Sequence, residues 1–185
     1  MENLLRFIHT IQPIGPSLDR AIRERLTQAE FKKGDILASP GRRADEIWFI
    51  AKGLAKEFHI EACGKVVVTT FWKENELMLI SDSFFLKLPS DRYIQLIEDC
   101  SLFNLESKKA HELLHLYPEL QSIIYKIQSI TQKKIEDRGA LMMLRGTERY
   151  ENFCENFPHT RISIVDAASY LGLTRVGLSK IRGKK

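Results

Sequence analysis

The spacing of hydrophobic residues along the chain changes twice. Up to about residue 28, apolar residues recur at helical spacing, and a break with proline and glycine at 13–16 divides them into two short predicted helices. Ser17 is placed to cap the second of these helices. Between Phe31 and Leu105 the chain consists of short runs rich in β-branched and aromatic residues, and after Ser107 the helical spacing returns. This order predicts helices, then β-structure, then helices again.

The middle part of the chain predicts an antiparallel β-structure. Its candidate strands are 35–38, 46–50, 54–60, 65–71, 93–97 and 101–105. Short strands bounded by turns at this spacing are typical of a small barrel or jelly roll. The predicted fold class is therefore α+β, with an N-terminal antiparallel β-roll between flanking helices.

A long helix should follow the β-roll. Ser107 can cap a short helix, and Pro118 can stand in the first turn of a longer helix that runs to about Leu144. Steps of four and three residues connect Ile123, Ile127, Ile130, Lys134, Asp137, Leu141 and Leu144. This heptad spacing predicts a homodimer interface formed by Ile123, Ile127, Ile130, Lys134 and Leu141. The alternative is one amphipathic helix that lies on its own β-roll.

Residues 161–182 carry the strongest functional signal, because they divide into two helices joined by a tight turn. Ser163 begins the first helix with Asp166 three places later, which is the spacing of a capping box. Gly172 can adopt the left-handed conformation that ends this helix, and Thr174 can cap the second. The arrangement is that of a helix-turn-helix, whose second helix enters the major groove of DNA.

The second helix should expose a surface that contains no acidic residue. We expect Arg175 and Lys180 to contact guanine O6 and N7, and Val176 to touch a thymine methyl group. Ser179 can contact a base edge or a phosphate. Better suited to phosphates are Ser163, Thr174, Arg182 and, unless they form a frayed tail, Lys184 and Lys185. The alternative is a helical hairpin that serves only packing or dimerisation.

Charge and composition narrow the classes of function. From Lys126 onward the chain has twelve Lys and Arg against six Asp and Glu, although its net charge is only +4. A basic C-terminal part favours a polyanionic partner, here double-stranded DNA. The longest apolar runs have five residues, whereas a membrane helix needs roughly 20, and no signal peptide is evident, so we expect a cytoplasmic protein with no membrane partner.

With these motifs in their order, the whole chain resembles the Crp/Fnr family of bacterial transcription regulators. The resemblance implies a cyclic-nucleotide-binding-like sensor roll over 1–117, a long dimerisation helix over 118–144, and a winged or plain helix-turn-helix domain over 145–185. It implies a homodimeric regulator that binds specific DNA, with effector binding in the roll repositioning the two DNA-reading heads. The effector itself is unknown.

The segment where the family holds the cyclic phosphate departs from the family pattern. Glu76 matches the acid that grips the ribose, but the arginine that should follow about ten residues later is absent, and Arg92 lies sixteen residues on. A segment near Ser83–Leu88 looks inserted. If a cyclic nucleotide bound, Glu76 would hold its ribose and Arg92 its phosphate; otherwise Glu76 is a strand-end carboxylate and Arg92 a surface ion-pair partner. A buried phosphate without a well-placed guanidinium is costly, so we expect neither cAMP in the usual way nor any other cofactor.

Two other classes of function are alternatives to the regulator. A cupin-type metalloenzyme needs several histidines and carboxylates that converge inside the roll, and between Phe31 and Leu105 there is one histidine, His59. The three cysteines lack the paired spacing of a zinc or iron–sulfur site. We therefore expect no enzyme and no metal. The remaining alternative is a ligand-binding or interaction module without specific DNA binding.

Overall fold

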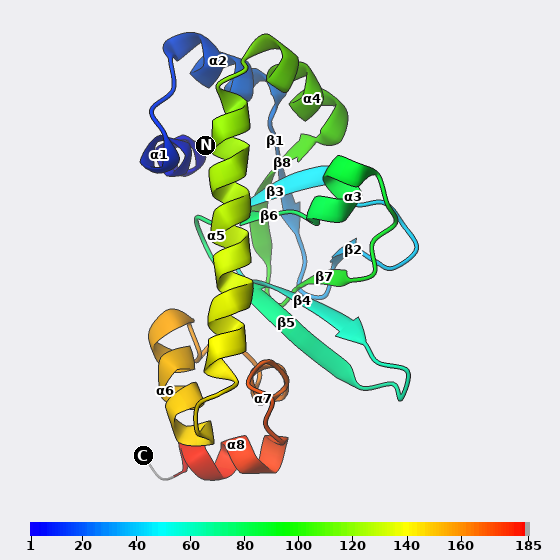
Figure 1. Ribbon diagram of the computed structural model, residues 1–185, viewed down its shortest axis with the longest axis vertical. Coiled ribbons are helices and arrows are strands. Elements are labelled where there is room, and N and C mark those ends of the chain that lie inside the picture. The colour runs from blue at the N-terminus through cyan, green and yellow to red at the C-terminus, as the bar shows by residue number, and fades with distance from the viewer. Residues whose placement is uncertain (184–185) are drawn as a thin grey trace.

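The computed structural model describes residues 1–183, so Lys184 and Lys185, predicted to contact phosphates, lie outside the described residues. A β-roll and a group of helices lie along one long helix, α5, which runs down the long axis of the molecule (Figure 1). The helices are α1 (Glu2–Ile11), α2 (Pro16–Arg25), α3 (Ser81–Leu86), α4 (Ser107–Leu116), α5 (Leu120–Leu141), α6 (Gly146–Asn156), α7 (Ile164–Tyr170) and α8 (Arg175–Arg182). The predicted α+β fold class is confirmed.

Within the described residues the strands form two four-stranded antiparallel sheets, in the orders β1-β8-β3-β6 and β2-β7-β4-β5. The strands are β1 (Thr27–Phe31), β2 (Ile36–Ala38), β3 (Glu46–Lys52), β4 (Ala55–Ile60), β5 (Val66–Trp72), β6 (Leu77–Met78), β7 (Tyr93–Leu96) and β8 (Cys100–Glu106). Strand β5 lies at the edge of its sheet, on the side of the C-terminal helices (Figure 1).

Several local expectations were wrong. Strand β1 occupies residues expected to end a helix, because Thr27–Phe31 pairs along its whole length with β8. Helix α2 is capped by Gly15 rather than Ser17, since Pro16 stands at its first position, where a missing N–H costs nothing. Similarly, Ser107 is the first residue of α4 and not its cap. Helix α5 begins after Pro118 and ends at Leu141, three residues before the predicted end.

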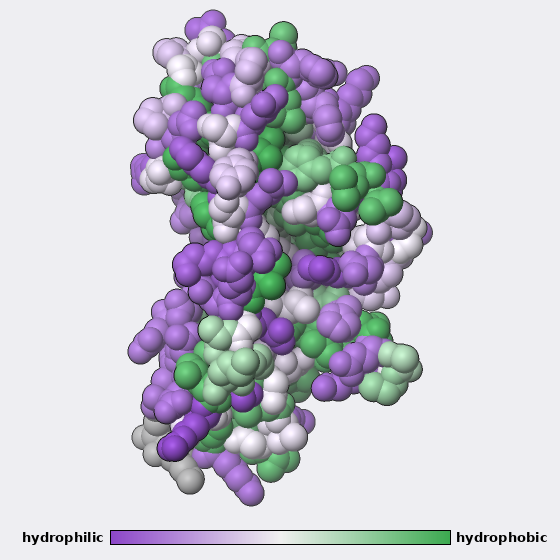
Figure 2. Space-filling view, viewed as in Figure 1, coloured by the Kyte–Doolittle hydropathy of each residue, from purple (hydrophilic) through white to green (hydrophobic). Residues whose placement is uncertain are grey.

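The inserted segment after β6 forms the short helix α3, which the sequence did not predict. Phe84 anchors it with no exposed surface, and the buried Ser83 hydroxyl accepts a hydrogen bond from the Ala44 N–H (2.6 Å). Leu86 at the end of α3 and Leu88 just after it are open, at 64% and 51% exposed. Hydrophobic side chains gather over α3 in Figure 2.

The interior of the roll is filled with side chains. Its buried cluster includes Ala38, Ala44, Trp48, Ile50, Ala55, Trp72, Met78, Ile80, Ile94, Leu96, Cys100 and Leu102. Trp48 and Trp72 are 3% and 4% exposed. Burying two indole rings and their aliphatic neighbours stabilises the roll and uses the space between its sheets.

A second cluster joins the roll to the C-terminal helices. Phe71 of β5 packs against Phe153 of α6 and Tyr170 of α7, with ring centroids 6.0 and 5.3 Å apart, respectively. Val68 of β5 and Leu178 of α8 belong to the same cluster. The two parts therefore share one hydrophobic core in this conformation.

Helix α5 packs on its own chain at both ends. Ile123 is 2% exposed in the core beside α1 and the roll, and Leu141 is 5% exposed in the cluster shared with the C-terminal helices. Ile127 is half-buried, and Lys134 forms an ion pair with Glu76. Of the residues predicted to form a dimer interface, Ile130 is the most open, at 46% exposed. Within one chain, Ile123 and Leu141 thus pack as the single-chain alternative describes, whereas Ile130 stays open.

Candidate nucleic-acid interface

Two hydrogen-bonded caps build the helix-turn-helix, as predicted. The Ser163 hydroxyl accepts from the Asp166 N–H at 3.0 Å, and the Thr174 hydroxyl accepts from the Gly177 N–H at 3.0 Å. Gly172 has a φ of +64°, which an L side chain rarely adopts, and a Cβ there would lie 3.2 Å from the Met142 sulfur. Local sequence therefore sets both helix starts and the turn between them.

Helix α8 is amphipathic, and its predicted DNA-contacting residues lie on the outer side. Leu178 has no exposed surface, and Ile181 packs partly buried beside it. Val176 is 65% exposed, and the helix carries no acidic residue. The other outward side chains are Arg175, Ser179, Lys180 and Arg182. The helix forms the lower end of the molecule in Figure 1, where the roll does not cover it.

Arg149 of α6 joins the end of α5 to the turn of the helix-turn-helix. Its guanidinium donates to the carbonyls of Met142 and Leu144 (2.8 Å each) and of Leu171 (3.0 Å). Carbonyls at helix ends lack intrahelical partners, so a charged donor satisfies them well. No signal in the sequence identified Arg149, because its partners belong to two different helix ends.

Polar contacts also hold α7 against the edge strand β5. The Ser169 hydroxyl accepts from the Val68 N–H and donates to the Val66 carbonyl, both at 2.9 Å. The Lys56 ammonium lies 2.5 Å from the Asp166 carboxylate, and these side chains are 12% and 15% exposed. This ion pair neutralises the acid at the start of α7, which would otherwise repel a phosphate backbone.

Arg161, just before α7, bridges two glutamates of the roll. It contacts Glu74 at 2.6 Å and also pairs with Glu98. Partial burial works to raise the pKa of Glu74, but hydrogen bonds from Arg161 and from the backbone outweigh it and hold that pKa below its ordinary value. These contacts fix the start of the helix-turn-helix on the roll.

The two residues predicted to hold a cyclic nucleotide have separate partners. Glu76 accepts from the Lys134 ammonium (2.7 Å) and from the Lys73 N–H (3.1 Å). Arg92 donates to Glu57 at 3.1 Å, and Glu57 is only 6% exposed. Burial works to lower the pKa of Arg92, but the Glu57 charge outweighs it and raises that pKa. No hydrogen bond or ion pair joins Glu76 to Arg92 among residues 1–183.

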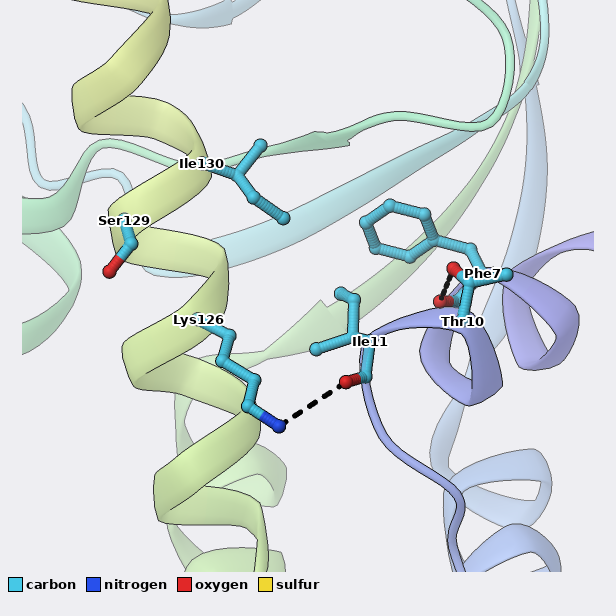
Figure 3. A pocket seen from close by; sticks show the side chains of 6 residues that line it. All are labelled: Phe7, Thr10, Ile11, Lys126, Ser129 and Ile130. Carbon is cyan, nitrogen blue, oxygen red and sulfur yellow. Dashed lines mark hydrogen bonds between the residues drawn. The ribbon is translucent and has the colours of Figure 1, made fainter.

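Two of the hollows beside α5 contain a lysine of that helix. One, of about 430 Å³, separates α1 from α5, and in Figure 3 Phe7, Ile11 and Ile130 point into it. Lys126 crosses its edge and donates to the Ile11 carbonyl at 3.3 Å. The second, of about 270 Å³, lies between α5 and the turn after β5 and contains Glu76 and Lys134. Sequence patterns identified neither hollow, because each joins distant segments.

One comparison with known proteins concerns the roll. Residues 28–117 match the family described as "Cyclic nucleotide-binding domain". The match covers slightly less than half of the chain. The matched range runs from the second residue of β1 to the residue after α4, so it includes strands of both sheets. No curated protein matches the chain.

Solved structures extend the likeness over most of the chain. FixK2 from Bradyrhizobium japonicum superposes with a TM-score of 0.76 at 15% identity, covering 86% of this chain and 83% of that one. CLP from Xanthomonas campestris, described as a c-di-GMP responsive global regulator, gives 0.72 at 15% identity, covering 92% and 91%. A putative Crp/Fnr-family regulator from Eubacterium rectale gives 0.74 at 12% identity, covering 92% and 83%. The chain therefore has the fold of Crp/Fnr regulators, as predicted.

Membrane-spanning helices and metal-binding clusters are both absent from residues 1–183. No helix in that range combines the length and apolar character needed to cross a membrane. No group of three or more histidine, cysteine, aspartate or glutamate side chains in that range is placed to hold a metal ion.

Proposed function

We propose that this protein is a homodimeric transcription regulator of Crp/Fnr type that binds specific DNA sequences. The observation that carries the proposal is the outer surface of α8. That surface contains two arginines and a lysine but no acid, and the Thr174 cap and the buried Leu178 hold it in place. A recognition helix needs such a surface, since base edges in the major groove are read by exposed side chains near the helix N-terminus.

The side chains of α8 divide into base-reading and positioning groups. Arg175 and Lys180 read guanine, and Val176 contacts a thymine methyl group. Ser179 serves either a base edge or a phosphate. The hydroxyls of Ser163 and Thr174 lie at helix N-termini, where phosphates bind well. Phosphate contacts set the position of the protein on the DNA and give little sequence information. Arg182, near the end of α8, belongs to this positioning group with Ser163 and Thr174.

Dimerisation through α5 would place two α8 helices on one duplex. Because Ile123 and Leu141 are buried within the subunit, the contact must use other side chains of α5. Tyr125 and Ile135, 70% and 54% exposed, are the most open large hydrophobic residues on that helix. A two-fold dimer reads half-sites about 34–36 Å apart along the DNA. We place the interface on the Tyr125–Ile135 side of α5; Ile130 lies on the other side of the helix, where it faces the hollow beside α1.

The test is selection of DNA from a random pool by the full-length protein, followed by binding titrations across a salt series. We expect one enriched sequence with two half-sites, bound roughly 10³-fold or more tightly than random DNA. Arg175→Ala should relax the preference at one base pair in each half-site, whereas Arg182→Ala should weaken all sequences alike. Lys108→Ala, at an exposed position of α4, is the matched control and should leave the binding of all sequences unchanged. If no sequence exceeds non-specific binding, the proposal fails and a ligand-binding or interaction module remains.

A further inference from the structure

The turn between β5 and β6 is bonded to α5 through one ion pair. Glu76 in that turn lies 2.7 Å from the Lys134 ammonium, and its carboxylate also accepts the Lys73 N–H at 3.1 Å. The two side chains are 22% and 29% exposed, so the pair is partly sheltered from water and salt. Glu76 is the residue that the family resemblance assigned to a ribose. Its carboxylate already has a cationic partner from the chain itself.

The space and the cation that a cyclic nucleotide would need in the roll are also occupied by the chain's own side chains. Trp48, Trp72 and Met78 fill the space between the sheets, with 3%, 4% and 0% of their surfaces exposed. Arg92 neutralises Glu57, which is 6% exposed. Moving Arg92 onto a phosphate would leave that buried carboxylate without a cation, with only the Thr69 hydroxyl (2.6 Å) as a partner, which is unfavourable.

The position of α5 on the roll also determines where the DNA-reading helix lies. Four residues past Lys134, Arg138 lies over the Tyr170 ring of α7, 5.3 Å from its centroid. At its end, α5 is joined to the helix-turn-helix by the three carbonyl bonds of Arg149 and by the shared cluster around Leu141. Helix α5, through its contacts with α6 and α7, therefore connects the Glu76–Lys134 contact to the helices that carry α8.

We propose that the Glu76–Lys134 ion pair takes the place of an effector, so that the protein binds its DNA without any small ligand. The inference rests on the DNA-binding function proposed above. A ligand shifts a conformational equilibrium only by binding one state better than the other. An internal ion pair that forms only in the DNA-binding arrangement favours that arrangement in the same way, without a ligand. The roll then acts as a fixed support for α5.

The experiment measures DNA affinity of the full-length protein with no ligand added, on the sequence that it selects. Lys134→Ala and Glu76→Gln each remove the charge pair, and both should weaken binding roughly five- to ten-fold. Lys134→Arg keeps the charge and should retain most of the affinity. Lys133→Ala is the matched control, since it breaks the exposed Lys133–Asp137 pair on the same helix. Its affinity should equal that of the unchanged protein.

Added ligand separates the proposal from ordinary effector control. Cyclic AMP, cyclic GMP and cyclic di-GMP at millimolar concentration should leave the affinity of the unchanged protein within two-fold, and a larger increase overturns the proposal. Unchanged affinity in both Lys134→Ala and Glu76→Gln overturns it as well. If the unchanged protein selects no DNA, the proposed function itself has failed. Amide hydrogen exchange in residues 73–76 then still tests the ion pair. If these amides exchange as slowly in Lys134→Ala as in the unchanged protein, the Glu76–Lys134 pair does not hold the turn.

Discussion

The roll and the recognition helix differ in how their charged side chains are satisfied. In the roll, Glu76 and Arg92 each have an internal partner of opposite charge. On α8, Arg175 and Lys180 face solvent from a helix without an acid. Groups that a protein pairs internally contribute to its own conformation, whereas exposed, acid-free basic groups are available to a partner. This difference supports the proposals that α8 binds DNA and that the roll supports it.

The largest expected effect is on the free energy of unfolding, through the hydrophobic core that the roll shares with the C-terminal helices. Leu178→Ala removes a side chain with no exposed surface, so the free energy of unfolding should fall by about 2–5 kcal/mol. Because the roll and the helices share that core, urea denaturation should show one transition for both. Val176→Ala is the matched control: Val176 is 65% exposed, and its change should lie within about 0.5 kcal/mol. Two separate transitions in the unchanged protein would show that the parts fold independently.

Arg149→Met should alter the placement of α8 without touching its DNA-contacting side chains. Three carbonyls lose a charged donor, which should cost about 2 kcal/mol of stability and roughly ten-fold in DNA affinity. The measurement is binding to the selected site with its half-sites moved apart or together by one base pair. We expect Arg149→Met to tolerate changes in the distance between half-sites better than the unchanged protein does. The base preference within each half-site should stay the same. A changed base preference would instead make Arg149 a reading residue.

Arg175→Ala tests the reading role of α8 itself. A bidentate contact to guanine contributes about 1–3 kcal/mol of discrimination, so the ratio of affinities for the selected and the substituted base pair should fall by that amount. Stability should stay unchanged, since Arg175 is exposed. Parallel titrations on the two DNA sequences and a thermal melt provide the readout. An equal loss on both sequences would move Arg175 to the phosphate-contacting group.

The smallest expected effect is on the acid stability of the contact between roll and head. Because the pKa of Glu74 is lowered in the folded protein, the stability that its bonds to Arg161 contribute is present above its ordinary pKa and is lost as the pH falls through the lowered value. Between pH 5 and about pH 3, Glu74→Gln should therefore lose less stability than the unchanged protein. Glu155→Gln, at an exposed position of α6, is the control. Identical acid profiles for all three proteins would exclude this contribution.

Local patterns in the sequence determined the helix-turn-helix and most of the roll. Ser163, Gly172 and Thr174 act on backbone groups within three residues, so their caps and turn could be predicted. Strands rich in β-branched residues were equally evident. Strand β1 was not, because its pairing with β8 joins residues far apart in the chain.

Only the tertiary structure decided which charges remain available. Arg92 meets Glu57 across 35 positions of sequence, and Arg149 reaches Leu171 across 22. The heptad spacing of α5 could equally serve a partner or the chain's own roll, and packing placed Ile123 and Leu141 inside the subunit. A residue's type and local spacing determine what it is able to bind, but only the fold brings it to a partner or leaves it facing solvent.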